Sequence, residues 1–310
     1  MLAQVMAVLA TLLMISAVQA QGVDQKASNK KVSNEILGQT FISGDSIEKI
    51  PRAAWEIADS SGSRIVSVSG KVAVHEAPAS ASRYSSKSYV FPTGTIWVFE
   101  FKKSQGGMIH AIKEENALYV LQGEGSVEVS GERLPIKQGD VVSYPAGALR
   151  GEADAIILAW KVTGTTSKDE SRPMFIKSAD AKVRLLGYWP GPDGQRVVVT
   201  TAEELRHAPS QAIRLEMRSY PFDGNSVTVT KNYRGGPTNK STGDRDGLLY
   251  ITSGKMRFFQ DDIDVIAGPG DAIRETAGKY HNWIRLEDSS FVGIGTTPAI
   301  SVKLDKPNDY

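Results

Sequence analysis

One histidine of this chain lies in a segment whose residue types and spacing suit acid–base chemistry. The segment runs from Gly270 to Arg285 and contains His281, one of four histidines in 310 residues. An imidazole titrates near neutral pH, so it can give or take a proton under ordinary conditions. Tyr280, Trp283 and Arg285 bring aromatic surface and positive charge to the same segment. We therefore predict that His281 is catalytic and that these three neighbours bind the substrate.

Two carboxylates extend this hypothesis. Asp244 and Asp246 lie in the sequence TGDRDG. They could act as acid or base beside His281, or supply oxygen ligands so that His281 and two aspartates bind Fe or Mn. A turn built on the local chemistry of Asp and Gly explains the same residues. Both aspartates are included among the predicted substrate-binding residues.

A second candidate set lies in the first half of the chain. His110, Asn116 and Arg150 would suit a carboxylate or the hydroxyls of a sugar, because a guanidinium pairs with a carboxylate through two parallel hydrogen bonds. An equally good interpretation is that Arg150 bonds to an acid of the protein itself. We predict all three as substrate-binding residues.

Short β-strands must position these side chains. Apolar and polar residues alternate with a period of two at 64–74, 95–101 and 117–129, and comparable runs recur between 212 and 294. Many short strands separated by turns are typical of a sandwich or barrel rather than of a helical or α/β fold. The sequence therefore predicts an all-β protein.

A repeat divides the strands into two similar sets. Gly123 and Gly254 are 131 residues apart, and so are Gly139 and Gly270. Glycines recur where a turn needs a positive φ, so a constant offset indicates that both halves make the same hairpins.

At these residues the chain resembles the cupin superfamily, and specifically a bicupin. Cupins carry two motifs, written G-x5-H-x-H-x3,4-E-x6-G and G-x5-P-x-G-x2-H-x3-N. The second motif is matched from Gly139 to Arg150, with Arg150 at the His position. It is matched again from Gly270 to His281, with Thr276 at the Pro position and Arg285 at the Asn position. The resemblance implies two tandem cupin-type barrels of the jelly-roll, or double-stranded β-helix, kind.

The resemblance also implies a metal site, held by two His and a Glu of the first motif and the His of the second. The first half has at these positions His110, Ile112, Asn116 and Arg150. The second half has Ser241, Gly243, Gly247 and His281. Arg has no lone pair to donate to a metal. We therefore expect either no cofactor or one divalent transition metal (Fe, Mn or Zn), with His281 as the ligand if one is bound.

Five segments organise the chain. An uncharged apolar run predicts a signal peptide at 1–20, and hence a secreted or periplasmic protein. A lead-in is expected at 21–60, the first barrel at 61–165, a linker with a short helix at 166–208, and the second barrel at 209–310.

The charge and cysteine content of the chain limit the kinds of binding partner that we expect. The net charge is +1, from 36 basic and 35 acidic residues, which offers no electrostatic footprint for nucleic acid or an anionic membrane. The chain has no cysteine, which excludes disulfides, thiolate metal sites and a cysteine nucleophile. We expect a small-molecule ligand and, by analogy with cupins, association into a homo-oligomer.

Three functions fit these residues. The first is an exported bicupin that acts on a small polar molecule, an acid or a sugar, by acid–base chemistry at His281 with little or no metal. The second is a bicupin that binds a small molecule without catalysis. The third is a metal-dependent oxygenase or decarboxylase that uses His281 with Asp244 or Asp246.

Overall fold

The computed structural model describes residues 40–59, 62–112, 115–129, 131–143, 147–162, 174–193, 195–210, 212–222, 225–234, 239–242 and 246–295. All of them belong to the unit that spans residues 33–310. The predicted signal peptide and Asp244 lie outside the described residues. Within the described part of the chain, no helix is both long and apolar enough to cross a membrane.

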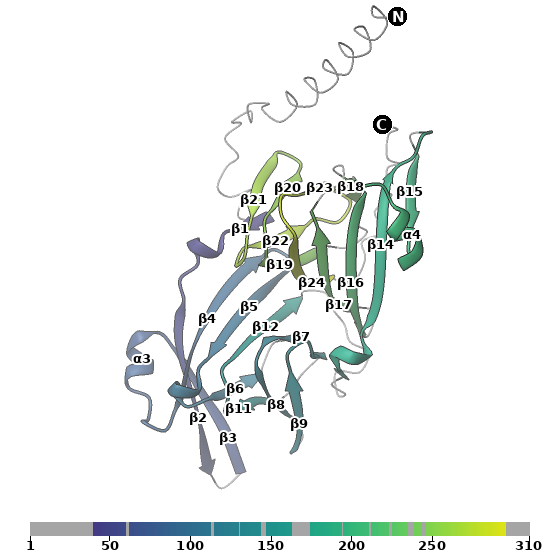
Figure 1. Cartoon of the computed structure of the whole chain (residues 1–310). Helices are drawn as coiled ribbons and strands as arrows, with labels where there is room; N and C mark the ends of the chain where they lie inside the picture. The colour runs from purple at the N-terminus through teal and green to yellow at the C-terminus, as the bar shows by residue number, and fades with distance from the viewer. Residues whose placement is uncertain are drawn as a thin grey trace, which may run out of the picture. The chain divides into compact units, whose positions relative to one another are not determined.

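The first half of the chain forms a barrel of two antiparallel sheets (Figure 1). Its eight-stranded sheet has the order β13 (Met174–Ile176), β10 (Val141–Ser143), β7 (Ala117–Gln122), β12 (Ala155–Val162), β5 (Gly94–Phe101), β4 (Ser82–Phe91), β2 (Ile50–Asp59) and β3 (Gly62–Ser69). Its four-stranded sheet has the order β6 (Met108–Ile112), β11 (Gly147–Gly151), β8 (Glu124–Val129) and β9 (Glu132–Lys137).

The second half repeats this arrangement. Its eight-stranded sheet has the order β1 (Phe41–Ile42), β22 (Ala272–Glu275), β19 (Gly247–Ser253), β24 (Ser289–Gly295), β17 (Asn225–Tyr233), β16 (Ile213–Phe222), β14 (Lys182–Pro190) and β15 (Arg196–Val199). Its four-stranded sheet has the order β18 (Asn239–Thr242), β23 (Tyr280–Arg285), β20 (Met256–Gln260) and β21 (Ile263–Ala267). The prediction of an all-β protein with two jelly-roll barrels is confirmed.

Side-chain alternation along the strands produces the three largest apolar clusters of the described residues. In β5, Trp97, Phe99 and Phe101 face the four-stranded sheet and fill the first barrel, whereas Ile96 and Val98 face the opposite way. An equivalent core fills the second barrel. The outward faces of the two eight-stranded sheets pack on each other, so a third core joins the halves.

Two aromatic pairs cross this shared core at equivalent positions. Tyr89 meets Tyr250 with ring centroids 5.8 Å apart, and Tyr119 meets Tyr220 at 6.2 Å, both edge to face. Tyr220 lies 131 positions after Tyr89, and Tyr250 lies 131 positions after Tyr119, so the two pairs are related by the repeat. The repeat in the sequence is therefore an approximate two-fold symmetry in the fold.

The first strand of each half pairs with a strand of the other half's barrel. Strand β1 pairs with β22 of the second barrel, and β13, which begins the second half, pairs with β10 of the first. Two equivalent aspartates secure these exchanged strands. The Asp271 carboxylate accepts a hydrogen bond from the Gly44 backbone N–H (2.8 Å), and the Asp140 carboxylate accepts one from Ser178 (2.9 Å).

Strands extend into both segments that the sequence suggested as connections. Strand β2 lies within the expected lead-in, and β14 and β15 lie within the expected linker. These strands lie at one end of each eight-stranded sheet. Because less of the protein packs on them there, the alternation of apolar residues in their sequence is weak. The short helix expected near residue 201 is α4 (Ala202–His207), and it begins with a complete capping box between Thr201 and Glu204. A second short helix, α3 (Lys71–His75), follows β3.

Candidate functional site

His281 points into the second barrel from β23. This strand lies between β18 and β20, and its alternation places His281 and Trp283 against Phe258 of the barrel core. The His281 side chain is only 7% exposed. The expectation that a cupin-type strand directs this imidazole inward therefore agrees with the structure.

A glutamate that the sequence motifs did not indicate lies against this histidine. Glu275 Oε1 is 3.3 Å from His281 Nε2, and the same oxygen accepts a hydrogen bond of 2.7 Å from Trp283 Nε1. Glu275 ends β22, opposite Gly247 of β19. A Cβ at Gly247 would lie 3.0 Å from Glu275 Oε2, so the carboxylate occupies the space beside a residue without a side chain.

The pair of Glu275 and His281 has the chemistry of an acid–base unit. A carboxylate at hydrogen-bond distance selects which ring nitrogen carries the proton and stabilises the imidazolium when a second proton arrives. The Trp283 indole N–H is a pure donor, so it holds Glu275 Oε1 in place without competing for the proton. Glu275 is the more accessible member, with 23% of its side chain exposed.

Arg285 lies on the same face of β23, further along the strand. Its Nε donates to Asn232 Oδ1 (3.0 Å) on β17, and its Nη2 donates to the Tyr188 hydroxyl (3.4 Å) on β14. Asn232 is buried, and its amide also donates to Met256 Sδ of the barrel core. Predicted site residues His281, Trp283 and Arg285 therefore share the interior of one barrel.

Asp246 does not converge on His281. Its carboxylate accepts hydrogen bonds from Arg274 Nε (2.6 Å) and the Ala277 backbone N–H (2.7 Å). Arg274 is the neighbour of the inward-facing Glu275, so its side chain leaves β22 on the opposite face. Asp246 thus braces the turn before β23, which agrees with the structural alternative that the Asp–Gly sequence left open.

Tyr280 does not share the barrel interior either. Tyr280 precedes His281 on β23, so its side chain points to the opposite face of the strand. It is 40% exposed and lies beside a cavity of about 490 Å³. This cavity is lined by Phe259, Gln260, Asp261, Tyr280, His281, Asn282 and Ile284.

The first barrel holds a second buried histidine with a carboxylate. His110 Nδ1 is 2.8 Å from the Tyr84 hydroxyl, and His110 Nε2 is 3.1 Å from Glu115 Oε1. The side chains of His110 and Glu115 are 6% and 7% exposed. The Phe99 ring packs against the imidazole at 4.4 Å between centroids. Burial raises the pKa of Tyr84, which keeps its hydroxyl protonated.

The structure separates Arg150 and Asn116 from His110. Arg150 bonds to Glu128 and, at 3.0 Å, to Glu56, both half-exposed acids. The Asn116 side chain accepts the Val162 backbone N–H and so closes the end of the β7–β12 pairing. The predicted pocket of three residues is therefore replaced by a buried unit of Tyr84, His110 and Glu115, which sequence motifs missed.

A difference in strand register explains Arg150. In the first barrel His110 pairs with Leu149, whereas in the second Ser241, the counterpart of His110, pairs with His281. The pairing of these two strands therefore differs by one residue between the two barrels. Because side chains alternate along a strand, a shift of one residue turns each side chain to the other face of the sheet. Leu149 thus enters the first barrel, and Arg150 leaves it.

Among the residues that the structure describes, neither barrel has a donor set that fits a metal ion. In the first, both nitrogens of His110 are engaged by Tyr84 and Glu115, and Ile112 is a buried apolar residue. In the second, Glu275 and His281 are two donors, and the described residues contain no group of three His, Cys, Asp or Glu suited to a metal. Two donors are fewer than transition-metal sites in proteins use.

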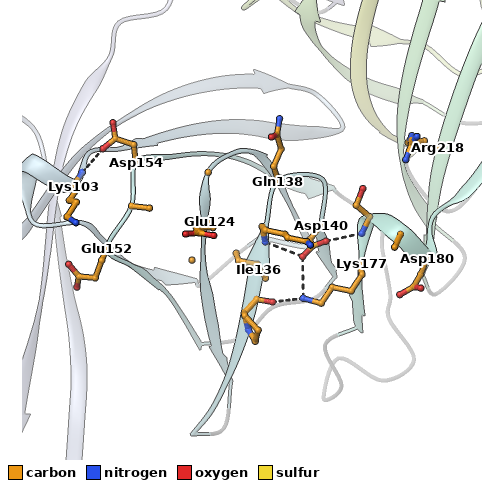
Figure 2. Close-up of a pocket in the computed structure, with 17 residues that line it drawn as sticks. Lys103, Glu124, Ile136, Gln138, Asp140, Glu152, Asp154, Lys177, Asp180 and Arg218 are labelled. Atoms are coloured by element: carbon orange, nitrogen blue, oxygen red, sulfur yellow. Dashed lines mark hydrogen bonds and ion pairs between the residues drawn. The ribbon is translucent and has the colours of Figure 1, made fainter.

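A further cavity lies away from the predicted site. It measures about 1600 Å³ and lies beside Lys177 and Ser178, which follow the exchanged strand β13 (Figure 2). Asp140 stands in its wall, where its carboxylate bonds to Lys177 Nζ (3.3 Å) and to the backbone of Lys137 (3.1 Å) and Ser178. None of the predicted site residues lines this cavity.

Comparison with known proteins gives a sequence match for the first barrel and a structural match for both. Residues 90–169 match the EutQ-like cupin domain. HEPD of Streptomyces albus, solved with 2-hydroxyethylphosphonate and Fe(II), is 9% identical, with a TM-score of 0.52 over 88% of this chain and 79% of that one. No curated protein matches the chain in sequence.

Two further solved structures are similar. Oxalate decarboxylase of Bacillus subtilis is 12% identical, with a TM-score of 0.48 over 88% of this chain and 79% of that one. A cupin 2 conserved barrel domain protein of Leptotrichia buccalis is 12% identical, with a TM-score of 0.40 over 69% and 89%.

The fold and its buried histidines define a protein of two jelly-roll barrels joined back to back. Residues 90–169, in the first barrel, match the EutQ-like cupin domain, and the two-barrel fold is similar to that of HEPD.

Proposed function

We propose that the second barrel binds a small polar organic molecule and that the pair of His281 and Glu275 moves a proton to or from it. The observation that carries this proposal is the distance of 3.3 Å between His281 Nε2 and Glu275 Oε1 inside the barrel. Fold similarity alone would not support a reaction, because cupin-type barrels host many activities.

The roles of the two residues follow from their exposure. Glu275 is the more accessible member of the pair, so it meets the substrate, and His281 lies behind it. A proton that leaves the substrate passes to the carboxylate and can rest on His281 as an imidazolium beside it, while the substrate keeps the electron pair. Trp283 keeps the carboxylate oriented throughout.

Deuterium exchange tests this proposal without knowledge of the natural substrate. The protein is incubated in D2O with hydroxy acids, keto acids and aldoses, and loss of exchangeable C–H signals is followed by NMR. We expect exchange with at least one compound, abolished in His281→Ala and reduced at least about 100-fold in Glu275→Gln, since a positioned acid–base group contributes 10²–10⁴-fold. Arg257→Met, on the outer face of the neighbouring strand, is the matched control.

Exchange that persists in His281→Ala, or a wild-type protein that exchanges nothing in the panel, would contradict acid–base catalysis. Circular dichroism melting of each variant separates loss of function from loss of fold.

Non-catalytic binding is the second candidate function. It is supported by the low exposure of His281 and by the first barrel, where His110 is held by Tyr84 and Glu115 in a packed interior. A protein of this kind would show saturable calorimetric binding of a compound whose protons do not exchange.

We also propose that the protein is exported. The support is the uncharged apolar run of residues 1–20. N-terminal sequencing of protein recovered from the periplasm or the medium should begin at Gln21.

A further inference from the structure

Arg285 carries a positive charge inside the second barrel, and no carboxylate of the described residues forms an ion pair with it. Its two described partners are the amide oxygen of Asn232 and the hydroxyl of Tyr188, both neutral groups. Asn232 is 3% exposed and Tyr188 is 8% exposed, so the guanidinium lies against buried polar atoms rather than in open water. A charge in such surroundings is costly unless an opposite charge accompanies it.

Several other half-buried arginines of the described residues have their counter-charge within the protein, whereas Arg52, Arg83 and Arg214 bond to hydroxyl or carbonyl oxygens. Arg274 bonds to Asp246, and Arg150 bonds to Glu128 and Glu56. On the outer face of β20, Arg257 makes two bonds to one carboxylate, that of Asp264. Among the described residues, no carboxylate oxygen lies within ion-pair distance of Arg285, although Arg285 stands on the same strand face as His281.

The hydrogen bonds of Arg285 to Asn232 and Tyr188 use one edge of its guanidinium. Nε and Nη2 form the side edge of the guanidinium, and these are the atoms that Asn232 and Tyr188 engage. The end edge, made by Nη1 and Nη2, has the spacing of two carboxylate oxygens. Because Asn232 and Tyr188 come from β17 and β14, two different strands fix the orientation of that edge.

We propose that Arg285 anchors a carboxylate of the ligand, so that the molecule bound in the second barrel is a small organic acid rather than a neutral sugar. This inference rests on the proposed function of the second barrel, and it selects one of the two ligand classes that the sequence left open. Arg285 pairs with the fixed acidic group, while His281 acts further along the same strand and Glu275 acts from the end of β22. Tyr188 and Asn232 are positioning residues that orient the guanidinium.

Matched acids and amides test the inference. Acetate, glycolate and succinate are compared with acetamide, glycolamide and succinamide by thermal shift and calorimetry, at an ionic strength kept constant with sodium chloride. We expect at least one acid to bind and its amide to bind at least about tenfold more weakly, because a hydrogen bond to a charged group contributes roughly 1.5–3 kcal/mol.

Variants assign the effect to Arg285. Arg285→Met should weaken binding of the acid about tenfold to a hundredfold, and Arg285→Lys should recover only part of the loss, since Lys lacks the planar fork. Tyr188→Phe should weaken binding by a few-fold and leave the preference for acid over amide intact. Arg257→Met, an arginine of similar exposure on the adjacent strand, should bind as the wild type does.

Failure of this inference is distinguishable from failure of the proposed function. Equal binding of acids and amides, no binding of any of these acids, or undiminished binding by a folded Arg285→Met variant would overturn the carboxylate anchor, even if proton exchange at His281 were observed. Arg285-dependent binding of an acid in both the wild type and His281→Ala would support the anchor, even if no proton exchange were found.

Discussion

Two buried histidines, one in each barrel, are each held by a glutamate from a different place in the fold. His281 meets Glu275, which comes from β22, and His110 meets Glu115, which lies between β6 and β7. Neither glutamate occupies the motif position at which cupins place their acidic ligand; Asn116 and Gly247 stand there. The two barrels therefore contain similar His–Glu pairs whose glutamates come from different positions in the fold.

The Tyr84 hydroxyl is predicted to contribute measurably to stability. Tyr84→Phe would leave His110 Nδ1 without its partner in a buried site. We expect the free energy of unfolding in urea to fall by about 1–3 kcal/mol, the cost of an unsatisfied buried polar group.

Tyr233→Phe serves as the control, because Tyr233 is 43% exposed and water can replace any bond of its hydroxyl. A Tyr84→Phe protein as stable as this control would show that the imidazole reorients to another partner.

At the scale of elements, the exchanged strands β1 and β13 depend on a few buried bonds. Strand β13 is only three residues long, so its pairing with β10 contributes little by itself. Asp140 is 1% exposed and receives three hydrogen bonds, from the backbone of Lys137 and Ser178 and from Lys177 Nζ. The aspartate therefore joins the exchanged strand to a turn of the first barrel.

Asp140→Ala is expected to lower the free energy of unfolding by about 3 kcal/mol, because three donors lose a charged acceptor in a buried site. Glu287→Ala is the control: its ion pair with Lys255 spans 3.9 Å at the surface, and its loss should change stability by less than about 0.5 kcal/mol. Chemical denaturation of both variants measures the difference, and similar values would show that β13 does not need this bond.

Sequence patterns predicted elements well and contacts between elements poorly. The glycines spaced by 131 residues and the period-two runs were sufficient for the two barrels, because both signals are local. The inward direction of His281 followed from its motif. Glu275, Glu115 and Tyr84 were missed because each meets its histidine only after strands pair. The two interpretations of Arg150 could not be separated from the sequence, because a register displaced by one residue leaves no mark in the spacing of glycines.

At the scale of the whole molecule, the shared core makes the two barrels one structure. Tyr119 and Tyr250 lie in this core or against it, on equivalent strands of the two halves. Burial raises the pKa of both hydroxyls to about 12, and for Tyr250 the neighbouring Glu100 and Asp271 carboxylates add to the effect.

Stability is therefore predicted to fall in alkaline solution. A tyrosine of the unfolded chain ionises near pH 10, whereas these two stay neutral in the fold until about pH 12. The unfolded state thus gains negative charge first, so the stability that is present below pH 10 is lost as the pH rises towards 12.

Urea denaturation between pH 9 and 11, with tyrosinate absorbance as a second signal, measures this slope. A double variant Tyr119→Phe and Tyr250→Phe should have a shallower slope, and an unchanged slope would assign the loss to other groups.

The exchange of β1 and β13 between the two barrels has a consequence for a chain that is cut into two halves. A polypeptide that stops after β12 lacks β13, so its β10 would have an unpaired edge, and a polypeptide that begins at β13 lacks β1 for its β22. Each piece carries the strand that the other is missing. Supplied as two separate polypeptides, the halves are thus complementary, and we expect them to recognise one another as a heterodimer more readily than either folds alone.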